Sequence, residues 1–180
     1  MASKKERFKK SKIALLFVTS FLSMIFFDIK FIYFAPFIIF LFYRLGFISI
    51  LWISIFIGLF QDLFSSVFFG INAISYFLTS ILLYNQKRFF NDKPINLSIF
   101  TVVFSMIFSI FNILLFFIFD KKLALSLKWL VSDIILFPIL DGIYTLILFA
   151  IPIWLFEKFM VLGFKNLWIR CKILIFQKSR

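Results

Sequence analysis

Residues 95–119, INLSIFTVVFSMIFSIFNILLFFIF, form a run of 25 residues without a charged side chain. As a helix this run would be about 37 Å long, and the hydrocarbon core of a bilayer is about 30 Å thick. The whole chain has the same character, since 63% of its 180 residues are hydrophobic and 23% are aromatic. Soluble domains are only about 45 to 50% apolar. The sequence therefore predicts an all-α integral membrane protein.

Five further apolar segments accompany this run: 13–27, 31–43, 45–60, 70–84 and 129–156. Together with 95–119 they predict six transmembrane helices. Segment 31–43 has 13 residues and contains Pro36. It would reach only about 20 Å, so it is either a half-crossing or a tilted span. Segment 129–156 contains Pro138 and Pro152, which predict a kink.

The net charge of +12 lies mainly outside the apolar segments. The charge distribution divides the chain into a basic arm (1–12), a transmembrane domain (13–156) and a basic tail (157–180). We expect the tail to lie as an interfacial helix on anionic lipid. Binding of the tail to an acidic protein partner is the alternative. If the N terminus is cytoplasmic, 16 of the 20 Lys and Arg residues are on the cytoplasmic side. The positive-inside rule then predicts that both termini are cytoplasmic.

The residue counts argue against an enzyme. Histidine is absent, cysteine occurs once as Cys171, and the eight acidic residues are scattered singly along the chain. Hydrolases with a His base, His-ligated metals and disulfide frameworks each lack a required residue. No Gly-rich phosphate loop occurs. We therefore expect no catalytic residues, no cofactor and no metal, and we expect the basic excess to meet membrane lipid rather than nucleic acid.

Small polar residues fall on one face of several apolar segments. In 95–119 they occupy an arc of about 80° around a helix, and they are Ser98, Thr101, Ser105, Ser109 and Asn112. Shorter stripes run along 45–60 and 70–84. Because lipid offers no hydrogen-bond partner, we expect the stripes to face inward and the Phe-rich faces to meet acyl chains. Helix packing, a ligand cavity and a groove for a partner helix are all compatible with this pattern.

Asp141 lies near the middle of segment 129–156. A carboxylate at that depth costs about 2.5 to 3.5 kcal/mol on insertion scales, so we expect it to face the interior and to be paired or protonated. Structural pairing near the kink and a functional role in the membrane are the two interpretations.

Residues 58–75, GLFQDLFSSVFFGINAIS, continue into Tyr84 and the basic pair Lys87-Arg88. This stretch resembles the MreD family of bacterial rod-shape-determining membrane proteins, whose most recognisable region is G-x-x-x-D-L followed by G-x-x-A, a helix and a basic cytoplasmic end. The length, the six segments and the basic termini are also similar. Asn72 stands where many relatives carry His.

The resemblance implies a non-enzymatic scaffold of the cell-elongation complex in the bacterial inner membrane. Such a protein would bind single-pass MreC and help to couple MreB filaments to the SEDS glycosyltransferase and its penicillin-binding transpeptidase partner. We expect Asp62 to orient the 61–69 turn or a partner loop, or alternatively to be solvated at a helix end. Gly58 and Gly70 would permit close backbone approach. The candidate partner-interface residues are Gly58, Gln61, Asp62, Gly70, Asn72, Ala73, Ser105, Ser109 and Asn112.

A small-molecule uptake subunit is the alternative function. The chain is similar in length and six-helix plan to the substrate-binding components of energy-coupling-factor transporters, whose fold the MreD resemblance also implies. Those components dock their coupling protein through a small-residue face on the first helix. Here Ala14 is followed at the corresponding spacing by Val18, which favours the scaffold.

Overall fold

The computed structural model describes residues 4–26, 32–64, 68–90, 94–119 and 131–155, and all regular secondary structure within these ranges is helical. The elements in chain order are α1 (Lys4–Phe26), α2 (Ala35–Phe42), α3 (Phe47–Phe64), α4 (Ile71–Tyr84), a 3-10 turn η1 (Asn85–Phe89), α5 (Pro94–Phe119), a π turn η2 (Ser132–Leu136), α7 (Phe137–Thr145) and a second π turn η3 (Leu146–Ala150). The predicted tail and the connection 120–128 lie outside the described residues.

Three helices are long and apolar enough to cross a membrane: Phe47–Phe64, Ile95–Phe119 and Ser132–Leu155. A shorter apolar helix, Ile13–Phe26, completes α1. The helix α4 has 14 residues, about 21 Å of helix. The described part of the chain is thus all-helical and has the composition of a membrane protein.

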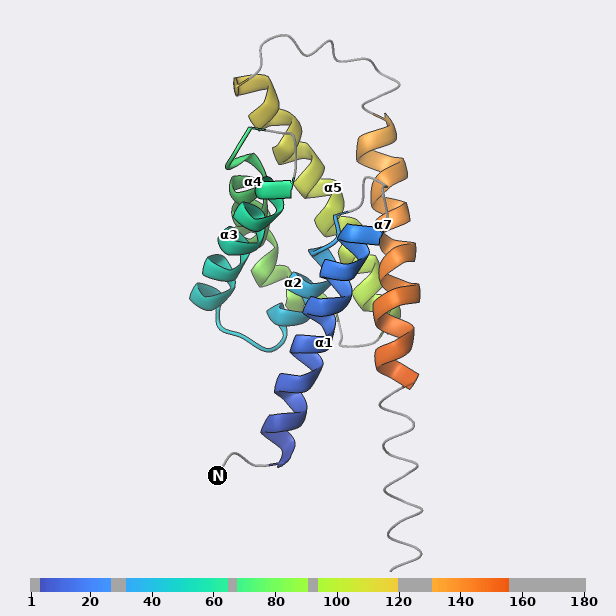
Figure 1. The fold of residues 1–180 in the computed structure, drawn as a ribbon. Coiled ribbons are helices and arrows are strands. Elements are labelled where there is room, and N and C mark those ends of the chain that lie inside the picture. The colour runs from blue at the N-terminus through green and yellow to red at the C-terminus, as the bar shows by residue number, and fades with distance from the viewer. Residues whose placement is uncertain (1–3, 27–31, 65–67, 91–93, 120–130, 156–180) are drawn as a thin grey trace, which may run out of the picture.

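The helices form an up-and-down bundle along one axis (Figure 1). The N terminus and the α2–α3 connection lie at the lower end of the view, whereas the end of α3 and the start of α4 lie at the upper end (Figure 1). The helix α4 runs back toward the lower end, α5 rises from there to the upper end, and the last helix descends beside α5. The most extensive packing joins α3 to α4 and α5 to α7. These two pairs enclose the short helix α2.

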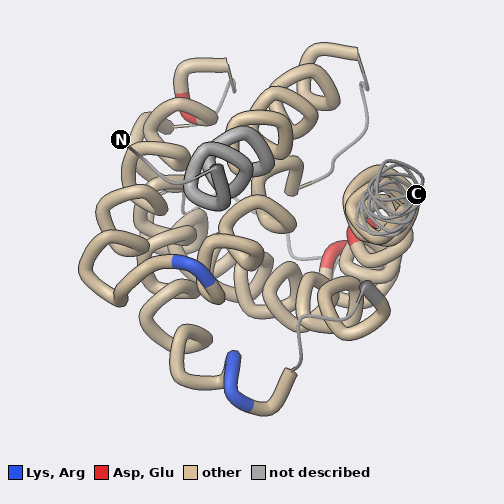
Figure 2. The backbone as a smooth tube through the Cα atoms, turned by 90° about the horizontal axis from the view of Figure 1, so that it is seen from below, with Lys and Arg blue, Asp and Glu red and all other residues tan. Residues whose placement is uncertain are grey.

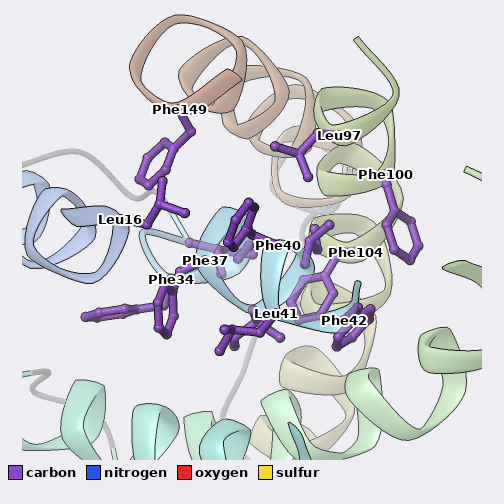
Figure 3. Close-up of a cluster of buried hydrophobic side chains, with 14 of the residues drawn as sticks. Leu16, Phe34, Phe37, Phe40, Leu41, Phe42, Leu97, Phe100, Phe104 and Phe149 are labelled. Carbon is purple, nitrogen blue, oxygen red and sulfur yellow. The ribbon is translucent and has the colours of Figure 1, made fainter. Parts of the chain in front are cut away.

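The helix α2 is the centre of the core, and all eight of its residues are buried. Its length of about 12 Å is less than half of a bilayer core. Of the two interpretations of segment 31–43, this length favours the half-crossing. Figure 3 shows its side chains among those of α1, α5 and the last helix, with the labelled residues Leu16, Phe34, Phe37, Phe40, Leu41, Phe42, Leu97, Phe100, Phe104 and Phe149.

Aromatic rings make much of this core. The ring of Phe42 meets Tyr84, Phe100 and Phe104 at centroid distances of 5.8, 5.9 and 6.3 Å. At the other end of α2, Phe34 meets Phe60 edge-on at 6.1 Å. Other Phe residues are exposed on the outer faces, where contact with acyl chains stays a prediction. The expectation is wrong for this core, because a helix buried on every side needs large apolar groups all round.

The predicted kink of the last segment takes the form of two π turns. The turn η2 ends two residues before Pro138, and η3 ends two residues before Pro152. A proline removes one backbone donor and clashes with the carbonyl of the preceding turn. Widening that turn accommodates the ring, so the helix continues to residue 155 without breaking.

The helices α3 and α4 approach most closely at Gly58. A Cβ on this residue would lie 2.6 Å from the backbone nitrogen of Ala73 and 2.9 Å from the carbonyl carbon of Asn72. Backbone atoms cannot yield as a flexible side chain can. The absence of a side chain at Gly58 is therefore a condition for the α3–α4 contact.

We predict that Gly58→Ala lowers the free energy of unfolding by about 2 to 3 kcal/mol, the range for overpacking a tight contact. Thermal unfolding of the purified protein in detergent measures this change. Gly46→Ala is the matched control, because a Cβ there meets nothing within 4 Å, and its effect should stay within about 0.5 kcal/mol. Equal melting temperatures for the two variants would contradict the close approach.

Candidate functional site

Asp62 caps the start of α4. Its Oδ2 accepts hydrogen bonds from the backbone N–H groups of Gly70 at 2.9 Å and Ala73 at 3.3 Å, and its Oδ1 accepts one from Asn72 at 3.2 Å. The side chain is only 3% exposed. The first N–H groups of a helix have no partner within the helix, and a negative charge there is also favoured by the helix dipole. Asp62 therefore supplies the start of α4 with both hydrogen-bond acceptors and a negative charge.

This geometry decides between the alternatives for Asp62. The carboxylate orients the connection between α3 and α4, as expected, and the solvated helix-end alternative is wrong. The helix α3 also continues to Phe64, four residues beyond the predicted end at 60. Asp62 thus projects from the last turn of a helix, which fixes its direction better than a place in the turn would.

Gly70 serves a different purpose from the one expected. Its φ is +99°, and a Cβ added to it would meet nothing within 4 Å, so close approach is not the reason for a glycine. A positive φ is a conformation that only glycine adopts without strain. Gly70 is the N-cap residue of α4, and its backbone turns the N–H groups of α4 toward Asp62.

Further hydrogen bonds join α3 to α4 along one face. The Tyr76 hydroxyl donates to Oε1 of Gln61 at 2.8 Å. Nearer the opposite end of α3, the hydroxyls of Ser54 and Ser80 are 2.7 Å apart. The predicted stripe of α3 therefore faces α4, as expected for inward-facing polar groups. Ser80 was not among the predicted residues; its place one helical turn from Tyr76 was the available signal.

Asp141 joins the last helix to the start of α2. Its Oδ1 accepts a hydrogen bond from the backbone N–H of Ile32 at 3.1 Å, across 109 positions of sequence. Ile32 begins the turn that leads into α2, because its carbonyl accepts from Ala35. Asp141 is 1% exposed and faces the interior, as predicted. This contact is of the kind that structural pairing predicts, and a functional role of Asp141 stays a prediction.

The polar stripe of α5 lies partly against the last helix. Ser98 donates to the carbonyl of Gly142, and Thr101 and Ser105 are fully buried. Ser105 lies beside the Asp141 carboxylate, although its hydroxyl makes no hydrogen bond of good geometry. Ser109 and Asn112, farther along α5, are half-buried.

Lys87 closes the other end of α2, and it was not predicted to do so. Its Nζ donates to the carbonyl of Phe42, the last residue of α2, at 2.8 Å. A cation at a helix C terminus complements the negative end of the dipole. The sequence signal was weak, because a lysine after an apolar segment is normally attributed to the positive-inside rule.

Two clusters thus emerge from the predicted residues. Five of the candidate positions meet at the upper end of the α3–α4 pair: Gly58, Asp62, Gly70, Asn72 and Ala73. Ser105 lies beside Asp141 in the centre, and Gln61, next to Asp62, accepts a hydrogen bond from Tyr76. Both clusters serve backbone groups at helix ends, so their residues work within the chain, and their contact with a partner stays a prediction.

For the α3–α4 pair, we predict that Asp62→Ala destabilises the protein by about 2 to 4 kcal/mol, since three N–H groups lose an acceptor. Asp62→Asn keeps one acceptor oxygen and should cost about half as much. Thermal unfolding in detergent measures both. If Asp62→Ala unfolds at the wild-type temperature, the cap contributes nothing.

For the central contact, Asp141→Ala should cost about 1 to 3 kcal/mol, because it leaves the buried Ile32 N–H without an acceptor. Asp141→Asn retains an oxygen in the place of Oδ1 and should be closer to the wild type. The same unfolding experiment compares them, and an Asn variant less stable than the Ala variant would contradict the contact.

The described residues contain no group of three or more His, Cys, Asp or Glu side chains that could hold a metal ion. What the arrangement does is hold short helices in place within a bundle. No protein-family model, curated protein or solved structure matches this chain.

Proposed function

We propose that this chain is a non-enzymatic membrane scaffold of the MreD type, acting in the bacterial cell-elongation complex. The observation that carries the proposal is the Asp62 cap. The residues on which the resemblance rests, Gly58, Asp62, Gly70 and Ala73, are neighbours in one buried arrangement. A motif whose parts share one physical task supports the resemblance better than the same letters scattered over the fold would.

The proposed topology has six helical segments in the inner membrane, of which α2 is short and crosses only part of the bilayer, with both termini in the cytoplasm. The described cations Arg44, Lys87 and Arg88 support it, because they lie at the end of the bundle where α1 begins. The basic arm precedes or begins α1 at that same end. Positively charged loops are retained in the cytoplasm. The α3–α4 turn would then face the periplasm.

A scaffold needs a defined outer shape rather than a reactive group. The Asp62 cap fixes the start of α4, Asp141 holds the turn before α2, and the α3–α4 pair presents the resulting surface. We propose that this surface, with the half-buried Ser109 and Asn112 of α5, meets the transmembrane helix of an MreC-like protein. The MreB-like filament and the SEDS glycosyltransferase with its transpeptidase would be reached directly or through that partner.

A second candidate, the substrate-binding subunit of an uptake transporter, is favoured by one observation. Polar side chains gather near the start of the half-helix α2, where Asp141 binds Ile32 and where Ser105 and Tyr76 lie near the same carboxylate. Transporters often bind substrate beside interrupted helices near the bilayer midplane. Here the Asp141 contact closes the helix start within the chain, so the scaffold is preferred.

Co-purification separates the two candidates. The tagged chain, expressed with an MreC-like protein in its own cells, should retain that protein through detergent extraction. Asp62→Asn and Asp62→Ala should lower the yield of the complex progressively and round the cells while membrane insertion persists. Gly46→Ala should leave the yield and the cell width unchanged.

Two outcomes would contradict the scaffold. One is a vitamin-like small molecule retained by the wild-type chain and absent from the Asp141→Ala variant. The other is normal cell width and normal complex yield in Asp62→Ala cells that contain wild-type amounts of the protein. Quantifying the protein in the membrane fraction distinguishes loss of binding from loss of the protein itself.

A further inference from the structure

Three cations lie close in sequence to the ends of helices that are long and apolar enough to cross a membrane. Arg44 precedes the membrane-crossing helix Phe47–Phe64 by three positions, and Lys87 and Arg88 lie between the end of α4 and the crossing helix Ile95–Phe119. Helix ends of this kind lie at the level of the lipid headgroups. Seen along the bundle axis, the Lys and Arg positions that Figure 2 draws in blue form two short stretches on the same side of the bundle.

Hydrogen bonds join the two segments that carry these cations. The Tyr43 hydroxyl donates to the carbonyl of Phe90 at 3.0 Å, and the Tyr84 hydroxyl donates to the carbonyl of Leu45 at 3.2 Å. Lys87 reaches Phe42 at 2.8 Å. The α2–α3 connection and η1 therefore form one surface, which we call the basic end.

The three cations of the basic end differ in their surroundings. The Nζ of Lys87, a half-buried residue, donates to α2 and lies 3.7 Å from the centre of the Tyr84 ring. Arg44 and Arg88 are both exposed, and their guanidinium groups lie over the rings of Phe40 and Phe89 at 5.3 and 5.0 Å. Ring contacts of this kind fix the direction of a guanidinium without removing its charge.

Of the residues whose side chains the structure describes, which leaves out residues 1–12 and 91–93, none at the basic end is acidic. Asp62 is at the far end of α3, Asp133 begins the last helix at that same far end, and Asp141 is at its middle. The described part of the basic end therefore has a net positive charge. A ligand that complements it must be anionic.

Apolar side chains adjoin the two arginines on the outside. Ile48, four positions after Arg44, is 71% exposed, and Phe89, directly after Arg88, is 68% exposed. Phe47 is also exposed. A ligand with a negatively charged head and apolar chains would satisfy both parts of this surface, which neither free phosphate nor a polar peptide does.

We propose that Arg44 and Arg88 bind the headgroup phosphate of an anionic phospholipid in the leaflet at the basic end, while Lys87 holds α2. The acyl chains of the lipid run along the outer face of α3 beside Ile48. This lipid site is independent of the proposed scaffold function. It would exist equally in a transporter subunit, so the failure of one proposal leaves the other in place.

Binding of dioleoyl phosphatidylglycerol to the detergent-purified protein, followed by native mass spectrometry, tests the site. The variant R44Q/R88Q should bind this lipid about thirtyfold more weakly than the wild type, and each single variant about fivefold more weakly. Dioleoyl phosphatidylcholine, which carries a phosphate but no net charge, should bind weakly to all of these proteins. The variant K121Q/K122Q, which loses two charges next to the opposite end of α5, is the matched control and should bind as the wild type does.

Equal phosphatidylglycerol affinity in the wild type and in R44Q/R88Q would overturn the proposal. It would also be overturned if R44Q/R88Q kept its lipid but lost a co-purifying protein with an acidic cytoplasmic segment, since the surface would then belong to that partner. Wild-type melting temperatures for both double variants establish that a loss of binding is not a loss of fold.

Discussion

A helix that starts or stops inside a membrane exposes backbone groups that lipid cannot satisfy. This constraint dominates the structure, because α2 spans less than half of a bilayer and is buried on every side. Asp141 accepts from the N–H of Ile32 in the turn that leads into α2, and Lys87 donates to the carbonyl of Phe42 at the end of α2. Asp62 accepts hydrogen bonds from the backbone N–H groups at the start of α4. Asp62 and Lys87 thus complete helix ends, and Asp141 holds the turn that precedes α2.

The same constraint explains the aromatic core. A half-helix with no lipid-facing side must be surrounded by other helices, and large rings such as Phe42, Phe100 and Phe104 fill the space between them. Gly58 and Gly142 let helices come closer, each opposite a polar or small residue of the neighbouring helix. Packing and capping therefore support one another, since each close approach places a helix end within reach of its cap.

Much of this could be predicted from the sequence, and the remainder could not for identifiable reasons. Apolar run lengths predicted the helices, and the periodicity of Ser54, Thr101 and Ser105 predicted their inward faces. Long-range pairs were beyond such patterns, because nothing local connects Asp141 with Ile32, 109 positions away. Gly70 was recognised, but its purpose depends on a backbone angle that the sequence does not reveal. Lys87 was attributed to the positive-inside rule alone, and the sequence does not reveal that the same side chain also binds the carbonyl end of α2.

The central claim is that Asp141 secures the start of the half-helix. Solid-state NMR on protein reconstituted in lipid bilayers measures it directly, as the dipolar coupling between the amide ¹⁵N of Ile32 and the ¹³Cγ of Asp141. The N···Oδ1 distance of 3.1 Å places these nuclei about 4 Å apart, so clear dephasing is expected. A separation beyond about 6 Å, well outside hydrogen-bond range, would contradict the account.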